Sequence, residues 1–173
     1  NSIGNYYHPS ANFMDINFVD SLSDRDYISG LAEVIKCDFI ADIDFIDYLH
    51  KHKVAILRRD EEYLVHLMQR TIKIKVDHVH NDVREGGKRL LLNYGHTLGH
   101  AIEMATHTEN GETFRHGEGV ALGMVAVVYL AELHLSTSIE VKQKMIEMLE
   151  AYQLPTHFSA SKLGLKRDNL INL

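Results

Sequence analysis

The near absence of proline is the feature that most constrains how this chain can fold. The only two prolines are Pro9 and Pro155, one near each end of the 173 residues. Proline lacks a backbone N–H donor and breaks a helix when it lies in the helix interior. A long stretch without it therefore favours long, uninterrupted helices. We expect residues 1–173 to form a single, mainly α-helical bundle domain.

Apolar periodicity and capping residues predict where these helices lie. Ser23, with Asp26 three residues later, resembles a capping box and predicts a helix from Asp26 to Phe39. Further helices are predicted over residues 42–52, 59–80, 89–106, 116–134 and 138–152, and another is expected to start at Ser159. Residues 11–19 alternate loosely between apolar and polar side chains, which allows one short strand or extended segment near the N-terminus.

The composition excludes several classes of protein. The net charge of −6 and the lack of a basic stripe argue against nucleic-acid binding. The longest apolar run, Val120–Leu133, is too short to span a bilayer, so we expect a buried helix and no membrane partner. The chain's single cysteine, Cys37, cannot form an internal disulfide, which fits the reducing cytoplasm. The N-terminus shows no charged-then-apolar leader, so we expect no signal peptide.

Residues 89–103 contain the polar side chains that most suggest a site. Four of them recur at steps of four, three and four residues: Arg89, Asn93, His96 and His100. In one continuous helix this spacing would place all four on one face, opposite the leucines. A face that carries a cation, an amide and two imidazoles is typical of a metal- or anion-binding wall.

Two histidines four residues apart on a helix can bind one metal ion, as in the H-E-x-x-H motif. His96 and His100 have this spacing, but Thr97 stands where metalloproteases place their glutamate base. His116 precedes an apolar helix and is followed by Gly117, which adds no bulk near a metal. The spacing therefore predicts a metal site while arguing against a protease.

Glu33 is a carboxylate within an apolar turn, and Lys36 follows three residues later on the same face. Buried charges are normally paired or bound to a metal. Each candidate also has an ordinary interpretation: Glu33 and Lys36 as a surface pair, His100 as a core histidine, and Lys75 as a solvated lysine. Their joint occurrence in apolar or glycine-bounded surroundings favours an anion-and-metal site.

Four motifs, taken in order, resemble those of 3-dehydroquinate synthase. They are Gly30–Lys36, Arg84–Gly87, Leu92–Glu103 and His116–Met124. The resemblance covers nearly the whole chain and implies a two-domain enzyme, with an N-terminal α/β domain for NAD and a C-terminal helical domain for metal and substrate. The chain is similar to the C-terminal domain alone, because no glycine-rich dinucleotide fingerprint follows a strand. We therefore expect the NAD-binding domain to be absent from it.

The family's reaction follows from the resemblance. It implies a phosphorus–oxygen lyase of the shikimate pathway of aromatic amino acid biosynthesis. This enzyme converts 3-deoxy-D-arabino-heptulosonate 7-phosphate, a phosphorylated keto acid, to 3-dehydroquinate with loss of phosphate. The implied cofactors are Zn²⁺, or another divalent metal such as Co²⁺, and NAD⁺. The resemblance also implies a homodimer for the full-length protein, and we expect the 173 residues alone to be inactive.

The resemblance also implies roles for individual residues. The zinc ligands would be Glu33, His96 and His116. The substrate carboxylate would be bound by Lys75, Arg89 and Asn93. The substrate phosphate would be bound by His100 and Asn1. Lys36 would contact a substrate hydroxyl near the metal.

Other interpretations stay open. The related sugar phosphate cyclases that make 2-deoxy-scyllo-inosose or 2-epi-5-epi-valiolone share the metal motifs, although Arg89, Asn93 and His100 together favour a substrate with a carboxylate. Iron-dependent alcohol dehydrogenases use an aspartate where this chain has Glu33. A His-Asp phosphohydrolase would need a His-Asp dipeptide, and the chain has none. An isolated metal-binding domain without activity is the remaining alternative.

Overall fold

The computed structural model describes residues 10–80, 82–83, 86–107 and 113–159, and every regular element within these ranges is helical. The α-helices are α1 (Asp24–Ala41), α2 (Phe45–Leu57), α3 (Glu61–His80), α4 (His96–Thr106), α5 (His116–Leu135) and α6 (Ile139–Ala151). Two short 3₁₀ helices are η1 (Ile16–Ser21) and η2 (Lys88–Asn93). The mainly α-helical fold predicted from the sequence is confirmed. The helix expected after Ser159 falls outside the described residues.

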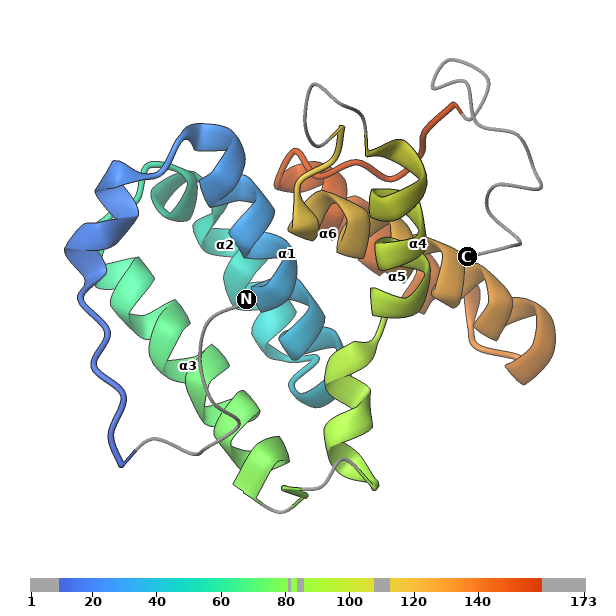
Figure 1. The fold of residues 1–173 in the computed structure, drawn as a ribbon, viewed down its shortest axis with the longest axis horizontal. Helices are drawn as coiled ribbons and strands as arrows, with labels where there is room; N and C mark the ends of the chain where they lie inside the picture. Colours follow the sequence, from blue (N-terminus) through green and yellow to red (C-terminus); the bar gives the residue numbers. More distant parts are fainter. Residues whose placement is uncertain (1–9, 81, 84–85, 108–112, 160–173) are drawn as a thin grey trace.

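Helix α1 joins the two halves of the bundle. It packs against α2 and α3 on one side and against α5 and α6 on the other (Figure 1). Its start agrees with the sequence, because the Ser23 hydroxyl accepts a hydrogen bond from the Asp26 backbone N–H at 3.1 Å. This central position lets side chains of α1 reach residues of both halves.

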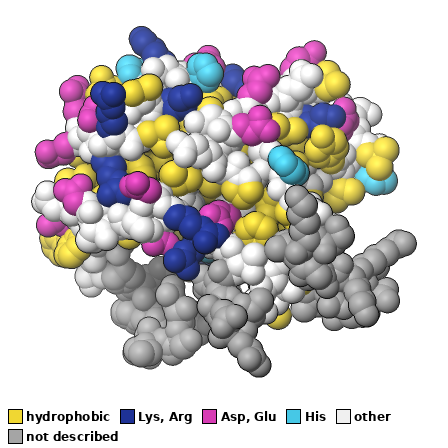
Figure 2. Space-filling view, turned by 90° about the horizontal axis from the view of Figure 1, so that it is seen from above, with side chains coloured by type: hydrophobic (Ala, Val, Ile, Leu, Met, Phe, Trp, Pro, Cys, Tyr) yellow, Lys and Arg dark blue, Asp and Glu magenta, His cyan; other side chains and the backbone are white. Residues whose placement is uncertain are grey.

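Helix α5 contributes many core residues and packs against α1, α4 and α6. Its buried residues are Gly117, Gly119, Val120, Ala121, Leu122, Gly123, Met124, Val125 and Val128. The second part of α5 is more exposed, with Leu130 at 50% and Leu133 at 75%. In the space-filling view of Figure 2, hydrophobic side chains likewise reach the surface among charged ones. The buried helix predicted over residues 120–133 is therefore buried mainly along its first half.

Two buried tyrosines join α2 to its neighbours. The Tyr27 hydroxyl of α1 donates a hydrogen bond to the Ile56 carbonyl at 2.5 Å, and the Tyr152 hydroxyl donates to the Leu49 carbonyl at 2.9 Å. Burial of an aromatic side chain with its hydroxyl satisfied stabilises a core without leaving an unpaired polar group. These bonds tie α2 to α1 and to the end of α6.

The short strand allowed over residues 11–19 is not formed. The segment instead contains η1, and the Asp15 carboxylate accepts a hydrogen bond from the Asn17 backbone N–H at 2.9 Å. An aspartate that caps its own following turn favours helical geometry over extended backbone. The loose alternation in the sequence therefore does not reflect strand pairing.

The prediction of a single helix over residues 89–106 is also wrong, because the helix is interrupted between η2 and α4. Gly95 lies at the break with φ +79°, a left-handed conformation that glycine adopts without strain. A Cβ atom at this position would lie 2.8 Å from the Met124 side chain of α5. Only His96 and His100 therefore share one helix, whereas Arg89 and Asn93 lie on η2.

Candidate metal and substrate site

Four helices bring the candidate residues together at one place. Glu33 comes from α1, Lys75 from α3, His96 from α4, and His116 from the first turn of α5. Packing of α1 against both α3 and α5 explains why residues so far apart in the sequence meet. The site is therefore a product of the tertiary fold rather than of one helix face.

The Glu33 carboxylate lies at the centre of this group. The Lys36 ammonium donates to both of its oxygens at 2.8 and 2.9 Å, and Lys75 donates to Oε2 at 3.2 Å. The Nε2 atoms of His96 and His116 lie 3.3 and 4.0 Å from Glu33 Oε1. One carboxylate thus faces two cations and two imidazoles.

The surroundings keep Glu33 ionised. Burial alone would raise the pKa of Glu33, but the hydrogen bond with His96 and the charges of Lys36 and Lys75 hold this pKa far below its usual value. Lys36 is only 1% exposed, and burial lowers its pKa despite the opposing charge of Glu33. Glu33 is therefore available as an anionic ligand, and Lys36 gives up its proton more readily than an ordinary lysine.

The group fits a divalent metal by its donor atoms and their spacing. Glu33, His96 and His116 each offer one ligand atom, and these atoms lie within 4.8 Å of one another. Tetrahedral ligands at about 2.1 Å from a zinc ion would lie roughly 3.4 Å apart, close to the 3.3 and 4.0 Å observed. Three protein ligands would leave a fourth position open, as in catalytic zinc sites.

The orientation of His96 agrees with this role. Its Nδ1 atom lies 3.3 Å from the Tyr94 carbonyl oxygen. A carbonyl can only accept, so a hydrogen bond there requires the proton on Nδ1 and leaves Nε2 facing Glu33. An imidazole nitrogen and a carboxylate oxygen that face each other need a proton or a metal ion between them, and the metal competes with protons for both.

A polar network fixes the first turn of α5, where His116 lies. Arg25 of α1 donates to both Glu118 oxygens at 2.7 and 2.6 Å, and the Gly117 N–H donates to the Ser29 hydroxyl at 2.9 Å. A Cβ atom on Gly117 would lie 1.8 Å from the Ser29 carbonyl oxygen. Glycine next to His116 therefore lets α5 start directly against α1.

Close approach of α4 and α5 brings the two metal-ligand candidates on them together. A Cβ atom at Gly123 would lie 1.9 Å from the Gly95 carbonyl oxygen, so only glycine fits there. This contact places the ring centroids of His96 and His116 5.3 Å apart. The glycines in the sequence motifs thus have a packing role that serves the site.

His100 also lies beside this group, and it brings in a residue that the sequence analysis did not single out. Its ring centroid is 5.5 Å from that of His96 and 5.3 Å from that of His116. The Glu103 carboxylate contacts both His100 and His116, at 2.8 and 3.3 Å from their Nδ1 atoms. The spacing of three residues after His100 on one helix was the signal that could have identified Glu103.

The two predicted residues Arg89 and Asn93 do not come from the four helices that form the metal-ligand group. Arg89 and Asn93 are on η2, which packs against α1 and α3. The Arg89 guanidinium donates to the Val83 carbonyl at 3.0 Å, and its backbone N–H donates to the Asp82 carboxylate at 3.0 Å. Asn1 lies outside the described residues. The structure thus gathers Lys36, Lys75 and His100 with the metal-ligand candidates, while Arg89 and Asn93 stand on a separate element.

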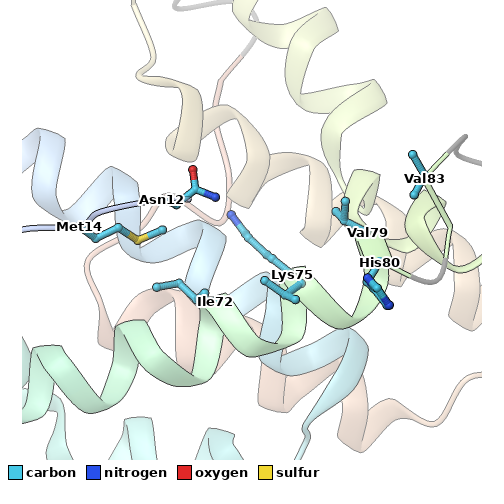
Figure 3. Close-up of a pocket in the computed structure, with 8 residues that line it drawn as sticks. Asn12, Met14, Ile72, Lys75, Val79, His80 and Val83 are labelled. Atoms are coloured by element: carbon cyan, nitrogen blue, oxygen red, sulfur yellow. The ribbon is translucent and has the colours of Figure 1, made fainter. Parts of the chain in front are cut away.

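A cavity of about 760 Å³ borders the site at Lys75. Figure 3 shows Lys75 extending from α3 toward Asn12, with apolar side chains of α3 along the cavity floor. It is lined by Asn12, Met14, Ile72, Lys75, Val76, Val79, His80 and Val83. The Lys75 ammonium therefore links this cavity to Glu33 and leaves room for a small molecule beside the site.

Comparison with known proteins identifies the family. Residues 30–172 match the family model described as 3-dehydroquinate synthase C-terminal. The chain belongs to this 3-dehydroquinate synthase family. It is 40% identical over 157 residues to the 3-dehydroquinate synthase of Citrifermentans bemidjiense, covering 90% of the chain and 42% of that protein. It is 37% identical over 172 residues to that of Solibacter usitatus, covering 99% and 46%. The chain thus spans less than half the length of these synthases.

One solved structure has the same fold over nearly the whole chain. It is ValA, a 2-epi-5-epi-valiolone synthase from Streptomyces hygroscopicus subsp. jinggangensis 5008, described with NAD⁺ and Zn²⁺ bound. The TM-score is 0.80 at 21% sequence identity, over 99% of this chain and 47% of ValA. At this identity the likeness concerns the fold alone, and it agrees with the helical domain of the 3-dehydroquinate synthase family.

Proposed function

We propose that this chain is the metal- and substrate-binding part of a 3-dehydroquinate synthase, a phosphorus–oxygen lyase that converts 3-deoxy-D-arabino-heptulosonate 7-phosphate to 3-dehydroquinate. The observation that carries the proposal is the Glu33 carboxylate facing Nε2 of His96 and of His116, at 3.3 and 4.0 Å, in a member of this family. Zn²⁺, or Co²⁺ in its place, would be held by these three residues. NAD⁺ would be bound mainly by an N-terminal domain outside this chain.

The chain's own residues account for the chemistry near the metal. When bound, the metal ion supplies Lewis-acid polarisation of the substrate hydroxyl, and NAD⁺ supplies the hydride chemistry. Glu33 stays ionised because Lys36 and Lys75 surround it. The lowered pKa of Lys36, caused by burial, suits a group that shares a proton with a substrate hydroxyl.

The substrate's two anionic groups call for separate cationic or donor side chains. We assign its carboxylate to Lys75 with Arg89 and Asn93, and its phosphate to His100 with Asn1. Lys75 borders the cavity and also contacts Glu33, which would place the carboxylate close to the metal. His100 is 55% exposed in its side chain, so it is accessible to a ligand.

A 2-epi-5-epi-valiolone synthase is the second candidate, favoured by the fold shared with ValA. The presence of both Asn93 and His100 supports the heptulosonate substrate over this alternative. From the family we infer a cytoplasmic homodimer for the full-length protein, and Cys37 is a buried free thiol.

Substrate binding to the zinc-loaded chain tests the proposal. Heptulosonate 7-phosphate and glucose 6-phosphate both carry a phosphate, but only the first carries a carboxylate. Because a charge-assisted hydrogen bond contributes about 1.5–3 kcal/mol, we expect the heptulosonate to bind on the order of tenfold tighter or more. Calorimetric titration measures both affinities.

The variant Arg89→Gln should lose most of this preference while keeping glucose 6-phosphate binding. Equal affinity of the unaltered chain for the two ligands would overturn the proposed substrate.

A further inference from the structure

The Glu103 carboxylate contacts two histidines at once. It lies on α4, and its Oε2 atom is 2.8 Å from Nδ1 of His100, while its Oε1 atom is 3.3 Å from Nδ1 of His116. The two imidazoles lie side by side, with ring centroids 5.3 Å apart and planes inclined by 29°. One carboxylate therefore bridges the α4 histidine next to the site and the α5 metal-ligand candidate.

The packing around Glu103 restricts its side chain. A Cβ atom on Gly119 would lie 2.9 Å from Cγ of Glu103, so the glycine makes room for the glutamate stem. The Glu103 side chain is 21% exposed, against 55% and 49% for those of His100 and His116. The carboxylate is thus the more enclosed partner, against which the two more exposed rings are held.

The shorter of the two distances indicates a hydrogen bond between Glu103 and His100 rather than ligation of a second metal by both. The 2.8 Å between Glu103 and His100 is an ordinary N–H···O length. It is shorter than the roughly 3.4 Å expected between two ligands of one tetrahedral ion. Because an ionised carboxylate only accepts, this bond requires the proton on Nδ1 of His100. A proton on Nδ1 of His116 would let that ring pair with Oε1 of Glu103 at 3.3 Å in the same way. In a neutral ring this leaves the Nε2 lone pair free to bind.

We propose that Glu103 is a positioning residue that fixes the Nδ1–H form of both His116 and His100. This form directs Nε2 of His116 to the metal and leaves Nε2 of His100 for the substrate. The metal part of the inference rests on the proposed function, whereas the imidazole protonation pattern does not. A carboxylate behind a metal-bound histidine orients the ring and raises its basicity.

The first test measures the protonation pattern in the unaltered, metal-free chain. Long-range ¹H–¹⁵N correlation spectra at alkaline pH distinguish the Nδ1–H and Nε2–H forms of neutral imidazoles. Signals are assigned with His100→Gln and His116→Gln. We expect the Nδ1–H form for both residues. The Nε2–H form at either one would overturn the proposal, whether or not any variant folds.

The second test measures zinc affinity by competition with a chromophoric chelator. Loss of such an outer carboxylate typically costs 10–100-fold in metal affinity, so we expect a loss of about that size in Glu103→Gln. Glutamine offers one oxygen where Glu103 offers two, so at most one imidazole stays oriented. The matched control is Glu132→Gln. Glu132 lies near the C-terminal end of α5, where its carboxylate pairs with Lys142 of α6, and this variant should bind zinc normally.

The outcomes separate this inference from the proposed function. If the unaltered chain binds no zinc, the proposed metal site fails, while the protonation pattern still decides the role of Glu103. If the chain binds zinc and Glu103→Gln binds it equally well with unchanged imidazole signals, only the inference about Glu103 fails. Two zinc ions per chain, with Nδ1 of His100 unprotonated, would show a metal site at Glu103 and overturn it too.

Discussion

At the residue scale, two carboxylates on α1 differ in protonation because only one of them has cationic and imidazole partners that outweigh its burial. Glu33 is surrounded by Lys36, Lys75 and His96 and stays ionised. Asp38, five residues later on α1, is fully buried, and among the described residues no donor lies within hydrogen-bonding distance of its carboxylate oxygens. Burial, with a smaller effect of the Asp42 charge, raises the pKa of Asp38 to about 8.

This raised pKa predicts a pH-dependent stability. Folding raises the pKa of Asp38 from 3.8 to about 8, so the folded chain binds the proton more tightly. The contribution of Asp38 to the free energy of unfolding is fully present below pH 4 and decreases up to about pH 8, by on the order of a few kcal/mol. Asp38→Asn should abolish this decrease and make the chain more stable than the unaltered protein at pH 8.

Urea unfolding of both chains at pH 5 and pH 8 measures the difference. Asp20→Asn, at an exposed aspartate, is the control and should follow the unaltered chain. If Asp38→Asn also shows the unaltered pH dependence, a buried protonated carboxyl at this position is ruled out.

At the element scale, glycines decide how closely α4 approaches α5. Gly123 has no room for a Cβ atom, whereas Gly30, exposed on α1, has nothing within 4 Å of one. We expect Gly123→Ala to lower the free energy of unfolding by about 1–3 kcal/mol through overpacking. Gly30→Ala should raise it by about 0.5–1 kcal/mol, because alanine is the better helix former.

Thermal or urea unfolding of the two alanine variants provides this comparison. The same sign of change in both would contradict the packing of α4 on α5 described above.

The sequence was most informative about individual helices and least informative about their breaks. The ranges predicted for α3 and α5 agree with the structure to within two residues at each end. The predicted continuous helix over residues 89–106 failed at Gly95, because its left-handed backbone depends on contact with Met124 of another helix. The periodicity of apolar residues along one helix cannot predict a contact with another helix. Glu103 was missed although it lies three residues after His100 on one helix, and its second contact, with His116 of α5, could not be predicted from local spacing.

At the scale of the whole molecule, residues from α1, α3, α4 and α5 form the site. The carboxylate and imidazole side chains predicted from the sequence as metal ligands are the ones that meet there. Glu33, His96, His100 and His116 could be singled out beforehand because carboxylate and imidazole groups stood in apolar or glycine-rich surroundings. The choice of Glu33, His96 and His116 as the three ligands came from the resemblance to the 3-dehydroquinate synthase motifs. Their separations of 3.3 and 4.0 Å required the packing of α1 between the two halves of the bundle. The proposed substrate contacts of Arg89 and Asn93 depend on η2 in the same way.

The chain spans less than half of its synthase relatives, which predicts its catalytic behaviour. We expect the 173 residues, supplied with zinc, NAD⁺ and heptulosonate 7-phosphate, to release no phosphate, because the proposed NAD⁺-binding domain lies outside them. A phosphate-release assay measures this directly. Turnover by the chain alone would show that the described helical domain carries the whole reaction.

Metal content is the most direct test of the central claim that Glu33, His96 and His116 hold a divalent metal. Purified chain is loaded with zinc, dialysed, and analysed by inductively coupled plasma mass spectrometry beside His96→Ala. Circular dichroism of both chains controls for folding. We predict about one zinc ion per chain for the unaltered protein, as expected for a three-ligand site, and loss of most of it in the variant. Unchanged zinc content in a folded His96→Ala chain would contradict the account.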